Sequence, residues 1–420
     1  MHKLFKFFNN DKLVKDGIIL FFGMAFIHIL NLLFQVVMGR VLSTSEYALL
    51  CTLLNMLNIF IIPLGVISTT LNRTTQILVQ ENRQGDILRL IIKTLKITFF
   101  IGIFLSLICF IFPTNIASFL NLNRTEPVLI FGFILLGLFS RPIFDSVLLG
   151  MQNFKDWLIV SIFGWSSRLI IGSILVLNIS AFAGWGLLGH GLGFYIAILI
   201  SILLLYSRLN KFKKTSLDLP PLTGFIGSSF IILFGLSIIM FSDIILVKHL
   251  YPHQVDEFAY AATLGRLIIF IPQAFITSMF PKVVSDKGTS SNHFKLFTRT
   301  LLIVLIITII GSVFFYWLVP FLMNLIYGIK SLSSNLLLWS RIFALSMVPV
   351  SLCLVCVRYV LAQKKYLLGL TIPLGAILYL CVIFEFQSGI INIIILLTLV
   401  SLAQVVIIFT FCLIEFRKIR

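Results

Sequence analysis

Long apolar runs separated by short polar connections account for nearly the whole chain. A run of about 18 or more largely apolar residues is long enough to cross a bilayer as a helix. Twelve such runs occur, at residues 17–38, 47–70, 94–112, 127–149, 157–178, 185–207, 223–247, 258–281, 298–319, 334–357, 366–384 and 389–413. The pattern therefore predicts an all-α integral membrane protein with about twelve transmembrane helices and no extramembrane domain.

The pattern of the first half of the chain recurs weakly in the second half. At an offset of 212 residues, Phe22-Gly23 matches Phe234-Gly235 and Asn31 matches Asp243. Further on, at an offset of 213, Ser45-Glu46-Tyr47-Ala48 resembles Phe258-Ala259-Tyr260-Ala261. Two related halves around a shared centre are typical of transporters. We therefore expect two six-helix lobes, at 1–207 and 222–420, joined by a basic cytoplasmic linker at 208–221.

Composition excludes a soluble protein. Of the 420 residues, 59% are hydrophobic and 11% are charged, and the mean hydropathy is +1.10. No soluble domain could cover that much apolar surface. A net charge of +17 would suggest nucleic-acid binding in a soluble protein. Here the basic residues lie in the connections between apolar runs, so no nucleic-acid partner is expected.

The basic residues also predict the orientation of the chain. Of the 32 lysines and arginines, 24 fall in the N-terminal segment and in the connections on one side of the expected membrane. The other side has only four, which are Arg40, Arg124, Lys248 and Lys330. By the positive-inside rule both termini are cytoplasmic. We expect a multi-pass protein of a bacterial cytoplasmic (inner) membrane, without a cleaved signal peptide.

Six charged residues lie inside the predicted spans away from their ends, namely Arg141, Asp145, Arg168, Asp243, Arg266 and Arg341. A charge deep in a spanning helix costs about 2.5–3.5 kcal/mol, so it usually faces a partner or a water-filled cavity. The first two are i,i+4 neighbours and can neutralise each other. Asp243 and Arg266 both lie in the outer halves of their spans, where a cross-helix pair is sterically reasonable. Two arginines would then remain, and either a cavity for an anion or snorkelling to headgroups and backbone carbonyls would accommodate them.

Polar residues follow one face of the first predicted span and recur in the second. His28, Asn31 and Gln35 are spaced i, i+3, i+7, and Asn55 and Asn58 lie three apart. Amides at such positions either bind helices together or line a cavity. His28 is a candidate proton relay because its charge switches near neutral pH, although a lone histidine is more often a satisfied polar contact.

No catalytic or metal-binding motif is evident in the sequence. The six cysteines lie in apolar runs, and the C-x-x-C of Cys353 and Cys356 has no other soft ligand nearby, which favours packing over a metal or redox site. No nucleotide-binding loop or hydrolase motif occurs. We therefore expect no metal, no cofactor and no enzymatic activity, and transport driven by an ion or substrate gradient.

Four stretches between and at the ends of the predicted spans carry a family likeness. They are Gly39–Tyr47, Leu148–Phe154, Ser242–Val247 together with Tyr260–Ala262, and Pro320 through Tyr327-Gly328. In their order and spacing the chain resembles the polysaccharide-export branch of the multidrug, oligosaccharidyl-lipid and polysaccharide flippase superfamily. The likeness runs over nearly the whole chain. Members of that branch are the lipid-linked oligosaccharide flippases of bacteria.

The resemblance implies a V-shaped pair of six-helix lobes around a cationic central cavity. Such proteins carry a polyprenyl-diphosphate-linked sugar unit to the outer leaflet for O-antigen or capsule. By position, Arg168 and Arg266 resemble cavity cations for the diphosphate, and Asp243 with the Arg141–Asp145 pair would modulate their field. The implied partners are the lipid-linked substrate, membrane lipids, a polysaccharide polymerase and a chain-length regulator.

Three hypotheses follow for the function. The leading one is a lipid-linked oligosaccharide flippase that works by alternating access. The second is a cation-coupled exporter of small molecules or drugs, for which Asp145 is the only candidate coupling carboxylate. The third, a membrane polysaccharide polymerase, is disfavoured because the predicted outer loops are about 15 residues or fewer. The candidate substrate-binding residues are Arg168, Arg266, Arg141, Asp145, Asp243, Arg341, Asn31, Gln35, Asn55 and Asn58.

Overall fold

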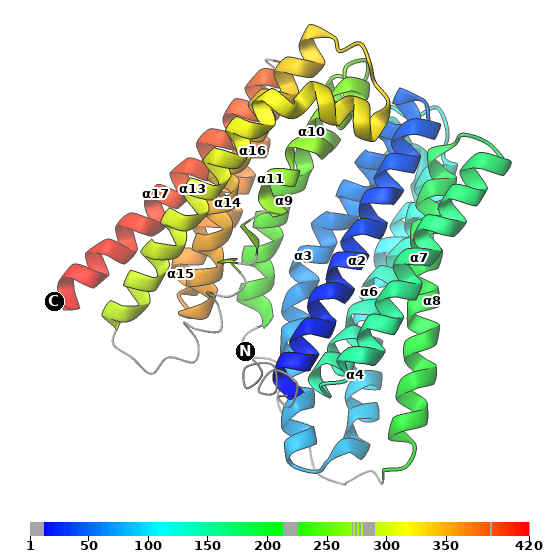
Figure 1. Cartoon of the computed structure of the whole chain (residues 1–420), viewed down its shortest axis with the longest axis vertical. Helices are drawn as coiled ribbons and strands as arrows, with labels where there is room; N and C mark the ends of the chain where they lie inside the picture. The colour runs from blue at the N-terminus through cyan, green and yellow to red at the C-terminus, as the bar shows by residue number, and fades with distance from the viewer. Residues whose placement is uncertain are drawn as a thin grey trace, which may run out of the picture. The chain divides into compact units, whose positions relative to one another are not determined.

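The computed structural model of the chain describes residues 12–212, 226–270, 290–386 and 389–419, with parts of 272–279. Over these residues the protein is helical and contains no strand. The helices are α2 (Lys12–Val41), α3 (Thr44–Gln80), η1 (Gln84–Asp86), α4 (Ile87–Ile111), α5 (Pro113–Phe119), α6 (Glu126–Gly150), α7 (Phe154–Asn178), α8 (Ala183–Leu209), α9 (Ile226–Leu250), α10 (Val255–Gly265), α11 (Leu267–Phe270), α13 (Ser290–Leu322), η2 (Met323–Tyr327), α14 (Ser334–Ala362), α15 (Tyr366–Gly369), α16 (Thr371–Phe386) and α17 (Ile390–Ile419) (Figure 1).

Within the described ranges, eleven helical stretches are long and apolar enough to cross a membrane. They correspond to eleven of the twelve predicted spans, so the all-helical, multi-pass fold class is confirmed. The exception is the predicted span at 258–281. There α10 ends at Gly265 and α11 is a short helix that stops before Pro272, a residue type that ends helices. The rest of this span lies partly outside the described residues.

The described helices divide into two compact units. Unit 1 comprises residues 1–46 and 64–226, and unit 2 comprises residues 47–63 and 227–420. Helix α3 contributes to both, and its segment in unit 2 ends at Pro63, a proline inside the helix. The predicted linker 208–221 is described only as far as residue 212, and the basic N-terminal residues before Lys12 also lie outside the described part.

In unit 1, α7 packs against α2 and α8, while α6 packs against α4 and α8 (Figure 1). Glycines allow α7 and α8 to approach closely. A Cβ atom on Gly189 would lie 2.4 Å from Cα of Gly172, and one on Gly193 would lie 2.5 Å from the carbonyl oxygen of Gly164. Small residues promote such contacts in membranes, where no hydrophobic effect drives helices together. Arg168 lies on α7 between Gly164 and Gly172, so this contact positions its side chain.

Residues around the start of α3 also hold the start of α8. Ser43 caps α3 by accepting a hydrogen bond from the backbone N–H of Glu46 at 3.3 Å. The carboxylate of Glu46 in turn accepts a 2.7 Å hydrogen bond from the backbone N–H of Ala183, the first residue of α8. A helix begins with unpaired N–H groups, and a carboxylate satisfies them well. This contact lies within unit 1.

In unit 2, α14 is the central helix. It packs against α10, α11, α13 and α17, and 83% of its spanning segment is buried. Helices α9 and α16 also meet closely, because a Cβ atom on Gly235 would lie 2.5 Å from Cα of Pro373. The segment 47–63 of α3 joins this unit, where the carbonyl oxygen of Ile59 accepts a 2.8 Å hydrogen bond from Ser237 of α9.

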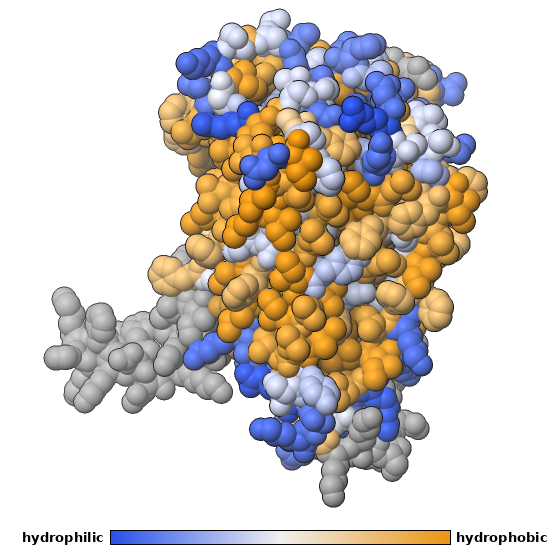
Figure 2. All heavy atoms as spheres, turned by 90° about the vertical axis from the view of Figure 1, so that its right-hand side faces the viewer, coloured by the Kyte–Doolittle hydropathy of each residue, from blue (hydrophilic) through white to orange (hydrophobic). Residues whose placement is uncertain are grey.

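The surface of the helices is suited to lipid. Many large apolar side chains are exposed, among them Phe100, Phe104, Leu177, Leu203, Phe314, Trp317 and Leu374. On the face drawn in Figure 2, hydrophobic residues form a broad central band and hydrophilic residues gather at both ends. All six cysteines are free, and five of them are buried. The surface agrees with a multi-pass membrane protein.

Candidate functional site

A buried polar cluster lies in unit 1 around Arg168 of α7. Arg168 is only 5% exposed. Its Nη1 donates a hydrogen bond to Oδ1 of Asn31 on α2 at 2.9 Å. Its Cζ lies 4.0 Å from the ring centroid of Phe34 and 5.0 Å from that of Trp165, both within cation–π range. Arg168 therefore points into the helix bundle of unit 1 and away from lipid.

The predicted ion pair on α6 is part of the same cluster. Nε of Arg141 lies 3.3 Å from Oδ2 of Asp145, one helical turn away. The Cζ atom of Arg141 is also 5.3 Å from the ring centroid of Phe194 and 6.0 Å from that of Trp165. Trp165 thus lies close to both guanidinium groups. Among the described residues Arg168 has no carboxylate partner, so two positive charges face one negative charge.

His190 of α8 completes the cluster and was not among the predicted site residues. It is 6% exposed, and its ring centroid lies 4.6 Å from that of Phe194 and 6.3 Å from that of Trp165. The sequence did contain a signal. His190 lies in the run Gly184–Gly193, in which glycines alternate with larger residues inside an apolar span. Those glycines mark the close helix contact beside it.

Three buried polar atoms of this cluster have no hydrogen-bond partner within the part of the chain that the structure describes. They are Nε of Arg168, Nδ1 of His190 and Oδ1 of Asp145, and they come from three different helices. Nearly all buried polar groups in native proteins are paired, with protein, water or ligand. We name Asn31, Arg141, Asp145, Trp165, Arg168 and His190 the unit 1 polar cluster. It has the chemistry to hold an anionic group.

Unit 2 contains the second buried pair, which the sequence also predicted. Arg266, at the end of α10, forms a salt bridge through Nη2 with Oδ1 of Asp243 on α9. Its Nε donates to the carbonyl oxygen of Met240 at 3.3 Å, and its Cζ lies 5.4 Å and 5.3 Å from the ring centroids of Phe241 and Phe343. Arg266 is 8% exposed and Asp243 is 1% exposed. Unlike Arg168, this arginine is neutralised.

Arg341 of α14 makes a different kind of contact. It is half-buried, its Nε donates to the carbonyl oxygen of Tyr316 at 3.2 Å, and its Cζ lies 4.0 Å from the ring centroid of the same tyrosine. A backbone carbonyl is one of the two partners expected for an arginine that does not bind a substrate. Its observed contacts are therefore structural ones with α13.

The predicted polar residues of the first two spans fall in different places. Of those on α2, Asn31 binds Arg168, Gln35 is half-buried and His28 is exposed. On α3, Asn55 is buried and donates to the carbonyl oxygen of Cys51 at 2.8 Å, while Asn58 is half-buried. Both α3 amides belong to unit 2. The structure thus groups only Asn31 of this set with the unit 1 polar cluster.

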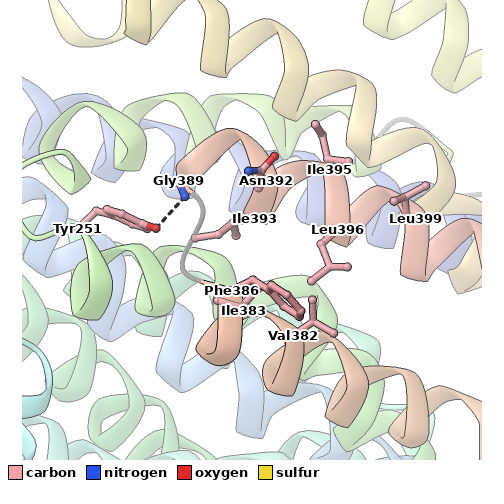
Figure 3. Close-up of a pocket in the computed structure, with 10 residues that line it drawn as sticks. All are labelled: Tyr251, Val382, Ile383, Phe386, Gly389, Asn392, Ile393, Ile395, Leu396 and Leu399. Carbon is pink, nitrogen blue, oxygen red and sulfur yellow. Dashed lines mark hydrogen bonds between the residues drawn. The ribbon is translucent and has the colours of Figure 1, made fainter.

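A pocket of about 290 Å³ lies elsewhere, on unit 2 between α16 and α17 (Figure 3). Its lining is mostly apolar, and at one end the backbone N–H of Gly389 donates a 2.7 Å hydrogen bond to the hydroxyl of Tyr251. None of the predicted site residues lines it. Over the described ranges, no group of three or more His, Cys, Asp or Glu side chains could hold a metal ion.

A scan against protein-family models and a comparison with curated proteins found no match to this sequence. Solved structures do match. The outward-facing structure of a multidrug resistance MATE family transporter of the MOP superfamily is 11% identical, with a TM-score of 0.67 over 96% of this chain and 95% of that chain. The inward-facing structure of such a transporter is also 11% identical, with a TM-score of 0.72 over 93% and 95%.

A third match is a MOP superfamily transporter from Pyrococcus furiosus, for which a reversed polarity of the binding pocket suggests a different function. It is 11% identical, with a TM-score of 0.67 over 96% of this chain and 95% of that chain. At these identities the comparisons show the fold alone. The chain has the two-lobed fold of MATE family transporters over almost its entire length.

Proposed function

Proceeding from this fold, we propose that the protein is a membrane transporter that works by alternating access and takes an anionic substrate. The spanning helices and the likeness to both an outward-facing and an inward-facing MATE structure support the transport part. Alternating access exposes one site to each side of the membrane in turn.

The observation that carries the anionic substrate is the state of Arg168. It is buried, it lacks a carboxylate partner among the described residues, and its Nε has no hydrogen-bond partner. A cation in this position costs about 2.5–3.5 kcal/mol on insertion scales. An oxyanion would neutralise the charge and accept the free N–H, and such charge-assisted hydrogen bonds are among the stronger ones in proteins.

The finer hypothesis is a flippase for polyprenyl-diphosphate-linked oligosaccharides in a bacterial cytoplasmic membrane, serving O-antigen or capsule synthesis. The diphosphate would bind Arg168, while amides such as Asn31 and Gln35 would bind sugar hydroxyls. The lipid tail would remain in the bilayer. The resemblance of the loop sequences to that branch supports this substrate, and a polymerase and a chain-length regulator would act on the product.

A cation-coupled exporter of small molecules is the second candidate. The comparisons support it more closely than the flippase, because matched structures are described as multidrug resistance transporters. Such an exporter needs a carboxylate as its coupling site. Asp145 is the candidate in unit 1, since its Oδ1 is buried and has no partner in the part of the chain that the structure describes.

Complementation of a deletion strain tests the proposal. We expect Arg168→Ala to abolish surface polysaccharide while the amount of membrane-inserted protein stays normal, because the variant loses the charge that binds the diphosphate. The matched control is Arg124→Ala, which removes an exposed arginine of the same unit in the connection before helix α6. Immunoblots of surface polymer and of the membrane fraction give both readings.

Two results would change the conclusion. Full surface polymer from Arg168→Ala would remove Arg168 from the binding site. A deletion strain with normal polymer and increased sensitivity to a panel of cationic drugs, reversed by the wild-type gene but not by Asp145→Asn, would establish the exporter instead.

A further inference from the structure

His190 is a buried titratable group that the proposed function does not yet use. It lies on α8 with its ring packed on Phe194 and near the edge of Trp165. Its Nδ1 has no hydrogen-bond partner in the described part of the chain. A histidine that is more than nine-tenths buried and leaves a ring nitrogen unpaired is costly unless that nitrogen meets a ligand or water.

The charged groups that face His190 come from both helices packed against α8. Helix α6 supplies Arg141, which is paired with Asp145 on the same helix, and α7 supplies Arg168. Both guanidinium groups lie near the Trp165 ring that His190 also approaches. The surroundings of the imidazole are therefore net positive while the site holds no anion. Nearby positive charges disfavour protonation of His190, whereas an anion bound between these groups favours it.

We propose that His190 is a proton-linked anion-binding group. When an oxyanion of the substrate binds Arg168, one imidazole nitrogen of His190 takes up a proton from the bulk solution and donates a hydrogen bond to the same anion. When the anion leaves, His190 releases this proton to the solution. No bond of the substrate forms or breaks. This inference rests on the proposed anionic substrate and adds the coupled proton.

Protonation of His190 would help to neutralise the negative charge of the bound anion. A diphosphate group carries more than one negative charge, and Arg168 supplies only one positive charge because Arg141 is paired with Asp145. Charges buried in a low-dielectric interior are tolerated when they are paired and hydrogen-bonded. A protonated His190 provides the second charge only while the anion is present, so the empty site avoids holding three cations.

Binding to the purified full-length protein in lipid nanodiscs tests the proposal. Isothermal titration calorimetry would use two probes, inorganic pyrophosphate and farnesyl diphosphate, between about pH 5.5 and pH 8, the range in which histidine ordinarily titrates. Measurements in two buffers that differ in ionisation enthalpy report the number of protons taken up. Binding of both probes assigns the site to the anion itself, and binding of farnesyl diphosphate alone assigns it to a lipid headgroup. Either pattern with proton uptake supports the proposal.

As pH falls, we expect the affinity of the wild type to increase relative to that of His190→Gln, by up to about tenfold per pH unit. His190→Gln should bind the probe at pH 8 nearly as tightly as the wild type does. At lower pH its affinity should change only because the probe itself is protonated. The matched control is His253→Gln, which changes an exposed histidine in the connection between α9 and α10 and should behave like the wild type.

The outcomes separate this inference from the proposed function. Loss of binding in Arg168→Gln with an unchanged pH dependence in His190→Gln would overturn the role of His190 alone. Unchanged binding in Arg168→Gln would overturn the anion site itself. If His190→Gln does not fold, wild-type calorimetry still decides, because no proton uptake refutes the proposal. Proton uptake that disappears in His28→Gln would refute it as well.

Discussion

Arg168 and Arg266 are both buried arginines, yet their surroundings differ in charge. Arg266 is neutralised by Asp243 and bound to the carbonyl oxygen of Met240. Arg168 is held by the neutral amide of Asn31 and by two aromatic faces. At the scale of single residues, Arg266 is thus satisfied by its own unit, whereas Arg168 keeps charge and a donor available for a ligand.

The Asp243–Arg266 pair makes a prediction about stability. Removing one partner of a buried ion pair leaves an uncompensated charge, which typically costs about 3–5 kcal/mol. We expect Asp243→Ala and Arg266→Ala each to lower the free energy of unfolding by that amount, and the double variant to lose much less than the sum. Unfolding followed by circular dichroism in mixed micelles measures all three.

Arg341→Ala is the control for these variants, because this half-buried arginine contacts Tyr316 and has no carboxylate partner among the residues that the structure describes. This variant should lower the free energy of unfolding by less than about 1 kcal/mol, the contribution of an ordinary hydrogen bond. If the double variant loses as much stability as Asp243→Ala and Arg266→Ala together, the two side chains do not stabilise each other.

At the scale of helices, the close contact of α7 and α8 links the fold to the site. The glycines of the contact leave no room for side chains, and Arg168 lies on α7 among them. Any change that separates the two helices also moves Arg168 relative to His190. The contact therefore sets the spacing within the unit 1 polar cluster.

Gly189→Ala tests this link. A Cβ atom there would lie 2.4 Å from backbone Cα of Gly172, so the helices must shift because backbone cannot move aside as a flexible side chain can. We expect a loss of stability of about 1–3 kcal/mol, typical of overpacking, together with weaker pyrophosphate binding. Thermal unfolding and calorimetry on the same sample measure the two effects.

The matched control is Gly65→Ala in α3, where a Cβ atom meets nothing within 4 Å. Alanine is the better helix former by about 0.8–1 kcal/mol, so this variant should be as stable as the wild type or more stable. Equal behaviour of the two alanine variants would contradict the proposed role of the helix contact.

At the scale of the whole molecule, the topology depends on the segment after α10. Eleven described helical stretches are long enough to span, and the remaining predicted span, 258–281, contains most of α10, all of α11 and residues only partly described. If that segment crosses the membrane, the number of crossings is even and both termini lie on the same side. From the distribution of lysine and arginine we predict that this side is the cytoplasm.

Reporter fusions check the topology. Green fluorescent protein fused after Arg420 should fluoresce and alkaline phosphatase fused there should be inactive, because fluorescence develops in the cytoplasm and phosphatase activity outside it. The opposite pattern is expected for fusions at the connection between α9 and α10, after Pro252. An active phosphatase at Arg420 would mean that residues 258–281 do not cross.

Properties that depend on neighbouring residues could be predicted from the amino-acid sequence. Hydropathy over about 20 residues identified eleven spanning helices, because the bilayer requires each span to be apolar along its whole length. Their ends were less well predicted: α3 continues ten residues beyond the predicted 47–70, and α13 begins eight residues before the predicted 298–319. The i,i+4 spacing determined the Arg141–Asp145 pair for the same local reason. The Asp243–Arg266 pair was also predictable, since the two helices are adjacent in sequence and the residues lie at similar depth.

Which helix faces meet could not be predicted from the sequence, because it depends on the packing of distant segments. Asn31 and Arg168 are 137 residues apart, and nothing local indicates that α2 and α7 pack together. The position of His190 depends likewise on the contact of α8 with α6 and α7, and residues 47–63 joined unit 2 although the repeat placed them in the N-terminal lobe. In a membrane protein nearly every face is apolar, so periodicity does not distinguish a face that meets lipid from one that meets another helix.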